Sequence, residues 1–304
     1  MLQRNAVPFL HAFDKCSAKD TNLNLAVLWW KSISGNKWGS STFDGFVAYD
    51  MLPDITRMIV GFPFCWLYPN LHHQNVALRT AFLDQALVDA IVKIGDDIEN
   101  SATVLSTSID QRAPRIVTLG AGFDTRSLRY HSSDGAFRKL RNSKVNADFY
   151  EIDLCPVVDQ KMRVFERFLK RRPKSIIPKL YGADLNDIDG VEKQLAAIFS
   201  DAGSNDMRTE KRPTVFIVEA VLMYLKEENV LPLLRMAMST AAKHSTSVKF
   251  CFADRLPGMP HDDKDVEVEK KAAVEILATV GLRLKTWQPK PGRARHMGVA
   301  EFII

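Results

Sequence analysis

The stretch that decides the fold is VTLGAGFDTR, residues 117–126. It begins as an apolar, β-rich run, turns at Gly120 and Gly122, and continues into the start of a helix. Glycine at both positions allows a sharp turn and a close approach of the backbone to a ligand. A dinucleotide-binding turn has a third glycine, and here that position is Thr125. The stretch therefore favours a ligand bound without a pyrophosphate, and a tight βα turn without any ligand is the alternative.

From Arg115 onward, short apolar runs alternate with helical segments. The predicted strands are Arg115–Gly120, Asp148–Asp153, Ile176–Leu185, Thr214–Ala220, Ser247–Ala253, Leu282–Trp287 and Val299–Ile304, with helices over 157–170, 191–202, 227–243 and 264–280. Continuous apolar runs are typical of parallel strands that helices cover on both faces. The last two runs are joined too briefly for a crossover, so they form an antiparallel hairpin. The sequence predicts a doubly wound, mostly parallel, seven-stranded α/β sheet, Rossmann-like, with a C-terminal antiparallel hairpin.

The first 110 residues have a different texture. Apolar residues at helical spacing predict helices over Asn22–Ile33 and Arg79–Glu99, and the Gly/Ser-rich stretch at 32–45 predicts a loop between them. We expect residues 1–110 to form a helical lid on the substrate side. Residues 111–304 form the ligand-binding α/β domain.

Acidic residues follow three of the predicted strands. Glu151 and Asp153 end the second strand, where a carboxylate commonly accepts hydrogen bonds from both ribose hydroxyls. Asp184, with the backbone N–H of Leu185, could meet an adenine, and Glu219 suits an ammonium or a sulfonium group. Each also has a plainer interpretation, as a solvated strand-end carboxylate, a turn residue or a helix N-terminal acid.

Composition excludes several classes of protein. The chain has 46% apolar and 25% charged residues, which excludes wholesale disorder, and a net charge of +5 that is too small to indicate a nucleic-acid binder. Its four cysteines form no C-x-x-C pair, so we expect no zinc site, no disulfide framework and no metal. No signal peptide and no apolar run of about 18 residues is evident, so we expect a cytoplasmic protein that does not bind membranes.

Taken together, VTLGAGFDTRSLR, YEIDLCPVVDQK, YGADLND and FIVEAVLMYL resemble the leucine carboxyl methyltransferase family of S-adenosylmethionine-dependent enzymes. A further family motif upstream matches Arg79-Thr-Ala-Phe-Leu-Asp84. The resemblance implies the class I methyltransferase fold and S-adenosylmethionine as cofactor. It also implies roles for individual residues: Arg79 would bind the methionine carboxylate, Gly120 the methionine moiety, Asp153 the ribose, Asp184 and Leu185 the adenine, and Glu219 the methionine end. Gly122 and Glu151 are further cofactor-binding candidates.

The resemblance implies methylation of a carboxylate, first of all the C-terminal leucine of a protein of the phosphatase catalytic subunit type. The segment 254–281 is shorter than in those members, which favours a small-molecule acceptor as the alternative; a cofactor-binding protein without catalysis is the third hypothesis. An ionised carboxylate needs no general base, so no catalytic residue is assigned, and Arg79, Glu219 and Tyr224 are positioning candidates. Further candidate cations, each with a solvated surface charge as the favoured interpretation, are Arg126 and the cluster of Arg293, Arg295 and His296. The basic run 161–174 is interpreted as a solvated helix face and loop, with a docking surface for an acidic partner as the alternative.

The predicted lid would also form the walls of the acceptor pocket. The helix Arg79–Glu99 should pack over the carboxyl ends of the strands, because Arg79 belongs to the cofactor motif. A narrow pocket would be closed by Trp38, Phe43, Phe62, Trp66 and Met223, and it would favour a small acceptor or a single C-terminal side chain inserted end-on. A wide groove lined by Arg293, Arg295 and the run 161–174 would instead favour a folded protein.

Overall fold

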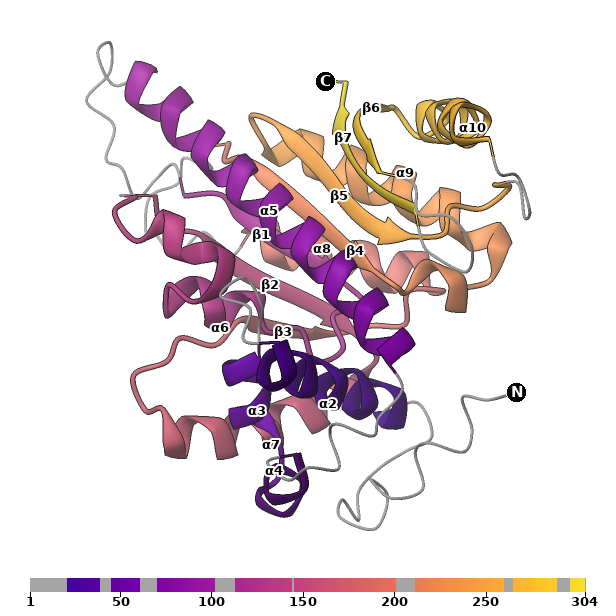
Figure 1. Cartoon of the computed structure of the whole chain (residues 1–304). Helices are drawn as coiled ribbons and strands as arrows, with labels where there is room; N and C mark the ends of the chain where they lie inside the picture. Colours follow the sequence, from indigo (N-terminus) through magenta and orange to yellow (C-terminus); the bar gives the residue numbers. More distant parts are fainter. Residues whose placement is uncertain are drawn as a thin grey trace. The chain divides into compact units, whose positions relative to one another are not determined.

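Seven strands form one sheet in the computed structural model (Figure 1). The strands are β1 (Arg115–Leu119), β2 (Asp148–Asp153), β3 (Lys179–Gly182), β4 (Thr214–Glu219), β5 (Val248–Asp254), β6 (Leu282–Gln288) and β7 (His296–Phe302). Their order in the sheet is β3-β2-β1-β4-β5-β7-β6. The first five strands are parallel, and β7 runs antiparallel to both β5 and β6. The predicted doubly wound sheet with a C-terminal antiparallel hairpin is confirmed.

The structure describes residues 21–38, 45–60, 70–101, 113–143, 145–200, 211–259, 265–288 and 296–303. The chain divides into two compact units, each made of three stretches. The first unit holds residues 1–84, 122–141 and 155–178, and the second holds 85–121, 142–154 and 179–304. The predicted boundary near residue 110 stays a prediction.

The second unit contains the whole sheet and its main core. Alternate strand residues, such as Val117 and Leu119 of β1, pack against helices α8 (Ile188–Ser200), α9 (Glu227–His244) and α10 (Val266–Ala278). Every residue of β1 is buried, as expected for a central strand that is covered on both faces. The 3₁₀ turn η5 (Leu222–Tyr224) also belongs to this unit.

Helix α5 (Asn70–Ser101) runs from the first unit into the second. In Figure 1 its second half crosses the strands. There Lys93 lies 3.5 Å from the carboxylate of Glu301, which faces Lys249 at the start of β5. The residues around Lys93 therefore lie beside the amino ends of the parallel strands, and only earlier residues of the helix could serve in the predicted lid.

The first unit is helical. It holds α2 (Thr21–Trp38), α3 (Gly45–Met51), α4 (Asp54–Val60), the first half of α5, α6 (Arg126–His131), the 3₁₀ helix η4 (Gly135–Leu140) and α7 (Cys155–Arg171). The Arg171 guanidinium donates to the carbonyl oxygens of Asp50 and Leu52 and pairs with Asp54. The end of α7 thus holds the turn between α3 and α4.

Some predicted boundaries are wrong. Residues 32–38 are helical rather than loop, because α2 continues to Trp38. The helix predicted to begin at Arg79 begins at Asn70. The predicted strand Ile176–Leu185 shortens to Lys179–Gly182.

Candidate active site

The candidate site lies at the carboxyl edge of the sheet in the second unit. Strand β1 pairs with β2 on one side and with β4 on the other, so the order of the strands reverses at β1. Ligands of doubly wound sheets bind at the carboxyl ends of the strands beside such a reversal. Gly120, Asp153, Asp184 and Glu219 follow or end β1 to β4, so the parallel sheet brings these predicted residues to one edge.

Position 120 requires glycine for two reasons, its backbone angle and the lack of space for a side chain. Its φ is +65°, in the left-handed region, and a Cβ at this position would lie 2.2 Å from Cγ2 of Val221. Its N–H donates to the carbonyl oxygen of Ile152 at 2.8 Å. The turn after β1 is therefore held between β2 and the loop that follows β4.

Gly122 belongs to the first unit and has φ +47°. A Cβ here would lie 2.7 Å from Oδ1 of Asn24, on α2. Within this unit, the close approach at Gly122 is made by the Asn24 side chain.

The two acidic residues of β2 lie in different environments. Glu151 is 3% exposed and pairs in register with Thr118 of β1, whereas Asp153 is half-buried at the end of the strand. The Asp153 carboxylate accepts from the N–H of Leu154 at 2.7 Å. Because side chains alternate along a strand, both face away from the core cluster that contains Tyr150. Asp153 is the more accessible acceptor for a ligand hydroxyl.

Asp184 and Leu185 follow β3. The Asp184 side chain is exposed, and its Oδ1 accepts from the N–H of Asn186 at 2.9 Å. Leu185 is 4% exposed and its side chain packs in the core. Any contact of Leu185 with a ligand would therefore use its backbone.

The loop after β4 carries backbone strain. Glu219 is half-buried at the end of the strand, and the next residue, Ala220, has φ +58°, which is uncommon for any residue except glycine. Such conformations are kept where the surrounding structure enforces them, and they often occur at functional sites. Met223 and Tyr224, in η5, are 49% and 52% exposed.

Asp254, which ends β5, holds this loop in place. Its carboxylate is fully buried and accepts the backbone N–H groups of Val221 and Leu222, the latter at 2.7 Å, and that of Arg255 at 2.8 Å. Asp254 is not among the site residues predicted from the sequence. An acidic residue directly after an apolar strand was the signal that could have identified it.

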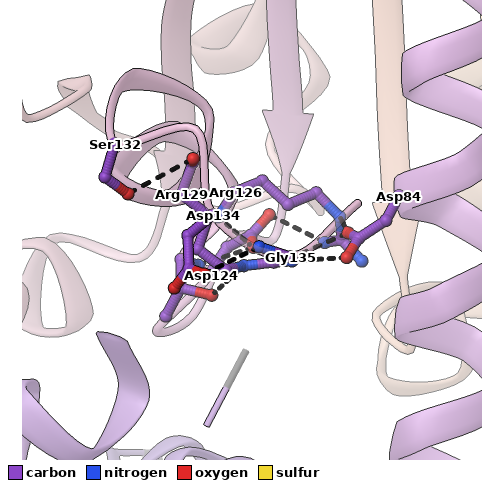
Figure 2. Close-up of polar contacts among 8 residues, drawn as sticks. Asp84, Asp124, Arg126, Arg129, Ser132, Asp134 and Gly135 are labelled. Atoms are coloured by element: carbon purple, nitrogen blue, oxygen red, sulfur yellow. Dashed lines mark hydrogen bonds and ion pairs between the residues drawn. The ribbon is translucent and has the colours of Figure 1, made fainter. Parts of the chain in front are cut away.

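A buried ionic cluster lies in the first unit, and Figure 2 shows its side chains directed at one another. Asp84 Oδ1 accepts from Nε of Arg126 at 3.0 Å and from a terminal nitrogen of Arg129 at 2.9 Å. A terminal nitrogen of Arg126 lies 2.9 Å from Oδ2 of Asp124. Side chains are at most 5% exposed in these ion pairs, and two positive charges face two negative ones. The favoured interpretation of Arg126 as a solvated surface charge is wrong.

Asp84 ends the Arg79-Thr-Ala-Phe-Leu-Asp84 motif, yet it is not among the site residues predicted from the sequence. Arg79 itself is half-buried on α5, in the first unit. The i, i+3 spacing of Arg126 and Arg129 after Asp124 was the sequence signal for the cluster.

The basic run 161–174 is only partly a solvated face. Lys161 is 2% exposed, and its Nζ lies 5.5 Å from the centre of the Phe165 ring. Met162, Arg163 and Lys170 are exposed. The expected groove and pocket walls at Phe43, Phe62, Trp66, Arg293 and Arg295 lie outside the described residues, as does the side chain of Trp38.

Perturbed pKa values occur at the opposite edge of the sheet. Burial, and then the charge of Arg212, lowers the pKa of Arg115, at the start of β1, to about 10. Burial, and then the charge of Arg115, lowers the pKa of His244, at the end of α9. Both residues lie at the amino ends of the strands, so these shifts reflect packing of the fold.

Two further findings concern the described part of the chain only. Among those residues, no three His, Cys, Asp or Glu side chains gather as a metal site would require. Within the same ranges, no helix has the length and apolar character needed to cross a bilayer.

The donor set fits S-adenosylmethionine. The cofactor carries a sulfonium and an ammonium group, two ribose hydroxyls and an adenine. The carboxylate of Glu219 could pair with the cationic end, and those of Asp153 and Asp184 could accept hydrogen bonds from the ribose hydroxyls and the adenine amino group. The side-chain-free turn at Gly120 lies at the same edge. No phosphate group has to be bound, which agrees with the two-glycine turn.

Several solved structures resemble the chain at low sequence identity. Similar solved structures include magnesium protoporphyrin IX methyltransferase from Synechocystis PCC 6803 with bound SAM (11% identity, TM-score 0.40, 94% of this chain and 97% of that one). Others are LepI in complex with SAM (11%, 0.39, 97% and 66%) and the pyocyanin biosynthetic protein PhzM (14%, 0.38, 97% and 76%). No curated protein matches the sequence.

The profile of the leucine carboxyl methyltransferase family matches residues 68–238, more than half of the chain. This range includes the glycine turn and the strand-end residues of β1 to β4. The protein therefore belongs to the leucine carboxyl methyltransferase family and is an S-adenosylmethionine-dependent methyltransferase.

Proposed function

We propose that the protein methylates a carboxylate, and that its acceptor is the C-terminal leucine carboxylate of a protein of the phosphatase catalytic subunit type. One observation carries the proposal: the leucine carboxyl methyltransferase profile matches the residues that contain all four strand ends of the candidate site. The shorter segment 254–281 supports a small-molecule acceptor as the second candidate.

The chemistry needs little from acid–base groups. S-adenosylmethionine supplies a methyl group on a cationic sulfur; a carboxylate oxygen displaces the neutral thioether, and a methyl ester forms without proton transfer. A C-terminal carboxyl has a pKa of about 3.5, so it is ionised at pH 7. The protein would contribute alignment and exclusion of water, which can lower a barrier by about 7–11 kcal/mol.

Each strand-end residue would have a binding role. Asp153 would accept the ribose hydroxyls, and Asp184 would accept the adenine amino group. Glu219, at the end of β4 and next to the loop that Asp254 holds in place, would neutralise the ammonium group. Gly120 would let the methionine chain pass close to the backbone. Arg79, in the first unit, has the role that the family motif implies, binding of the methionine carboxylate.

The acceptor can be tested with methyl-labelled S-adenosylmethionine and a peptide that ends in leucine. The matched control is the same peptide with a C-terminal amide, which has no carboxylate at that position. We expect label in the free-acid peptide only, released as methanol by mild base, because an ester is base-labile. Label in an extractable small molecule from a cell extract would replace our proposal with the second candidate. No transfer at all would contradict enzymatic activity.

The cofactor site can be tested separately by calorimetry with S-adenosylhomocysteine. Asp153→Ala removes two charge-assisted hydrogen bonds, so we expect a loss of about 2–3 kcal/mol, roughly 30–150-fold in affinity. Asp148→Ala is the matched control, because Asp148 begins the same strand and pairs with Arg212 at the opposite edge. Unchanged affinity in Asp153→Ala would mean that Glu151 binds the ribose or that the site lies elsewhere.

A further inference from the structure

An open pocket of about 440 Å³ lies in the first unit. Pockets for small molecules commonly have volumes of about 300–1,000 Å³. Its lining is polar and rich in guanidinium groups: Ser132, Ser133, Asp134, Arg138, Arg141 and Arg172. None of these residues has a role in the proposed methyl transfer.

Arg138 and Arg141 come from the same short element. Arg138 lies in η4, and Arg141 is the residue directly after the end of η4, three positions after Arg138. A 3₁₀ helix has three residues per turn, so the two side chains leave from one face. Both are exposed, and neither guanidinium has a hydrogen bond or an ion pair with another residue in the described ranges. Two cationic groups therefore line the pocket without a protein counter-ion.

Arg172 adds a third guanidinium from a distant part of the sequence. It follows the last residue of α7, and its Nε donates to Oδ2 of Asp50 at 2.6 Å. That bond orients the side chain and leaves the two terminal nitrogens without a partner among the described residues. Such a pair of N–H donors is suited to two oxygens of one anion.

The rest of the lining consists of two serines and one aspartate, and it sets the net charge of the pocket. The Ser132 hydroxyl donates to the carbonyl oxygen of Leu128 at 2.8 Å, and Ser133 has φ +52°. One oxygen of Asp134 accepts the N–H of Gly135 at 2.8 Å. Three guanidinium groups and one carboxylate give the lining residues a net charge of +2, and Asp50, the counter-ion of Arg172, is not part of the lining.

We propose that this pocket binds a phosphate ester of a small molecule, with its phosphoryl group held by Arg138, Arg141 and Arg172. A phosphate monoester carries about two negative charges at pH 7 and three acceptor oxygens, which match the charge of the lining and the number of guanidinium groups. A lone carboxylate would neutralise half of that charge. Asp134 and Ser133 would meet hydroxyl groups on the organic part, since the pocket is larger than a phosphate.

Calorimetric titration of the full chain tests the proposal, with ribose 5-phosphate, inorganic phosphate and ribose as probes. We expect binding of ribose 5-phosphate, weaker binding of inorganic phosphate and no binding of ribose. The double variant Arg138→Gln/Arg141→Gln should weaken the ribose 5-phosphate affinity at least tenfold, because it removes two charged donors. Arg172→Lys keeps the charge but loses the paired donors, so it should give a smaller loss.

Arg163→Gln is the matched control, since Arg163 is an exposed arginine of the same unit outside the pocket. Its affinity for ribose 5-phosphate should equal that of the natural chain. Equal affinities in this control and in the double variant would overturn the proposal, as would no response to either phosphate probe. Binding to vesicles that contain phosphatidic acid, without binding of the soluble probes, would also overturn it in favour of a lipid surface.

Discussion

Replacement of Gly120 by alanine tests whether the turn after β1 needs both an unusual backbone angle and empty space. The angle alone, φ +65°, should cost about 1–2 kcal/mol for a residue with a Cβ. The contact of 2.2 Å with Val221 should add about 1–3 kcal/mol, as overpacking does. We therefore expect Gly120→Ala to lower the free energy of unfolding by about 2–5 kcal/mol.

Gly258→Ala separates the two effects. Gly258 has φ +71°, and a Cβ there would find its nearest atom, Cδ1 of Ile276, at 4.0 Å. This control should lose only the angular part, about 1–2 kcal/mol. Urea denaturation of both variants gives the difference, which the structure assigns to the clash. The double variant Gly120→Ala/Val221→Ala should recover part of that difference, because it removes the nearest methyl groups.

Titration with S-adenosylhomocysteine completes the test. Gly120→Ala should lose measurable affinity, and Gly258→Ala should bind as the natural chain does. If Gly120→Ala is no less stable than Gly258→Ala, the close contact with Val221 does not exist. If Gly120→Ala keeps full affinity, the glycine turn is not where the ligand approaches.

Three further predictions concern buried polar groups. Asp254→Asn removes the charge and one of the two carboxylate oxygens of the residue that holds the loop after β4, so urea denaturation should show a loss of about 1–3 kcal/mol in the free energy of unfolding. Unchanged stability would contradict the role of Asp254 in holding the loop. Asp84→Ala leaves two buried guanidinium groups without their shared counter-ion and should lower the free energy of unfolding by about 3–5 kcal/mol. The control Asp89→Ala, at an exposed position of the same helix, should lower it by less than about 0.5 kcal/mol. Similar losses in both variants, measured by urea denaturation, would refute the role of Asp84 in the cluster. His244 has a lowered pKa because burial and neighbouring positive charges disfavour its protonated form, so below about pH 6.5 the unfolded state binds more protons and stability falls as the pH drops from 7.5 to 5.5. His244→Gln should reduce that fall, measured by denaturation at both pH values, and the exposed control His131→Gln should not.

The strands could be predicted from the sequence because their pattern is strong. Runs such as 215–218 are apolar throughout, which is typical of strands that are buried on both faces. Helix boundaries were harder to predict from the sequence. Residues 32–38 contain Ser, Gly and Asn, which favour loops locally, yet the segment continues α2, whose earlier turns are buried. Tertiary packing outweighs local preference there.

Some features of the candidate site could be predicted from the sequence, and others could not. The need for glycine at position 120 follows from a strand, a tight turn and a helix start, which are adjacent in the sequence. Local signals mark Asp84 and Asp254 as candidates, but they do not identify their partners, which lie 42 and 32 residues away and are brought close only by the folded chain. Sequence spacing reveals local turns well, but it does not show which buried carboxylate accepts which distant donor.

The passage of the chain between its two units has a consequence for engineering. Each unit consists of three stretches, so the chain crosses from one to the other five times, and one crossing follows Ala121 within the glycine turn. No single cut releases either unit as one continuous fragment. A chimera that takes one unit from a relative must exchange three separate segments and preserve five junctions, including the turn that the ligand is proposed to approach.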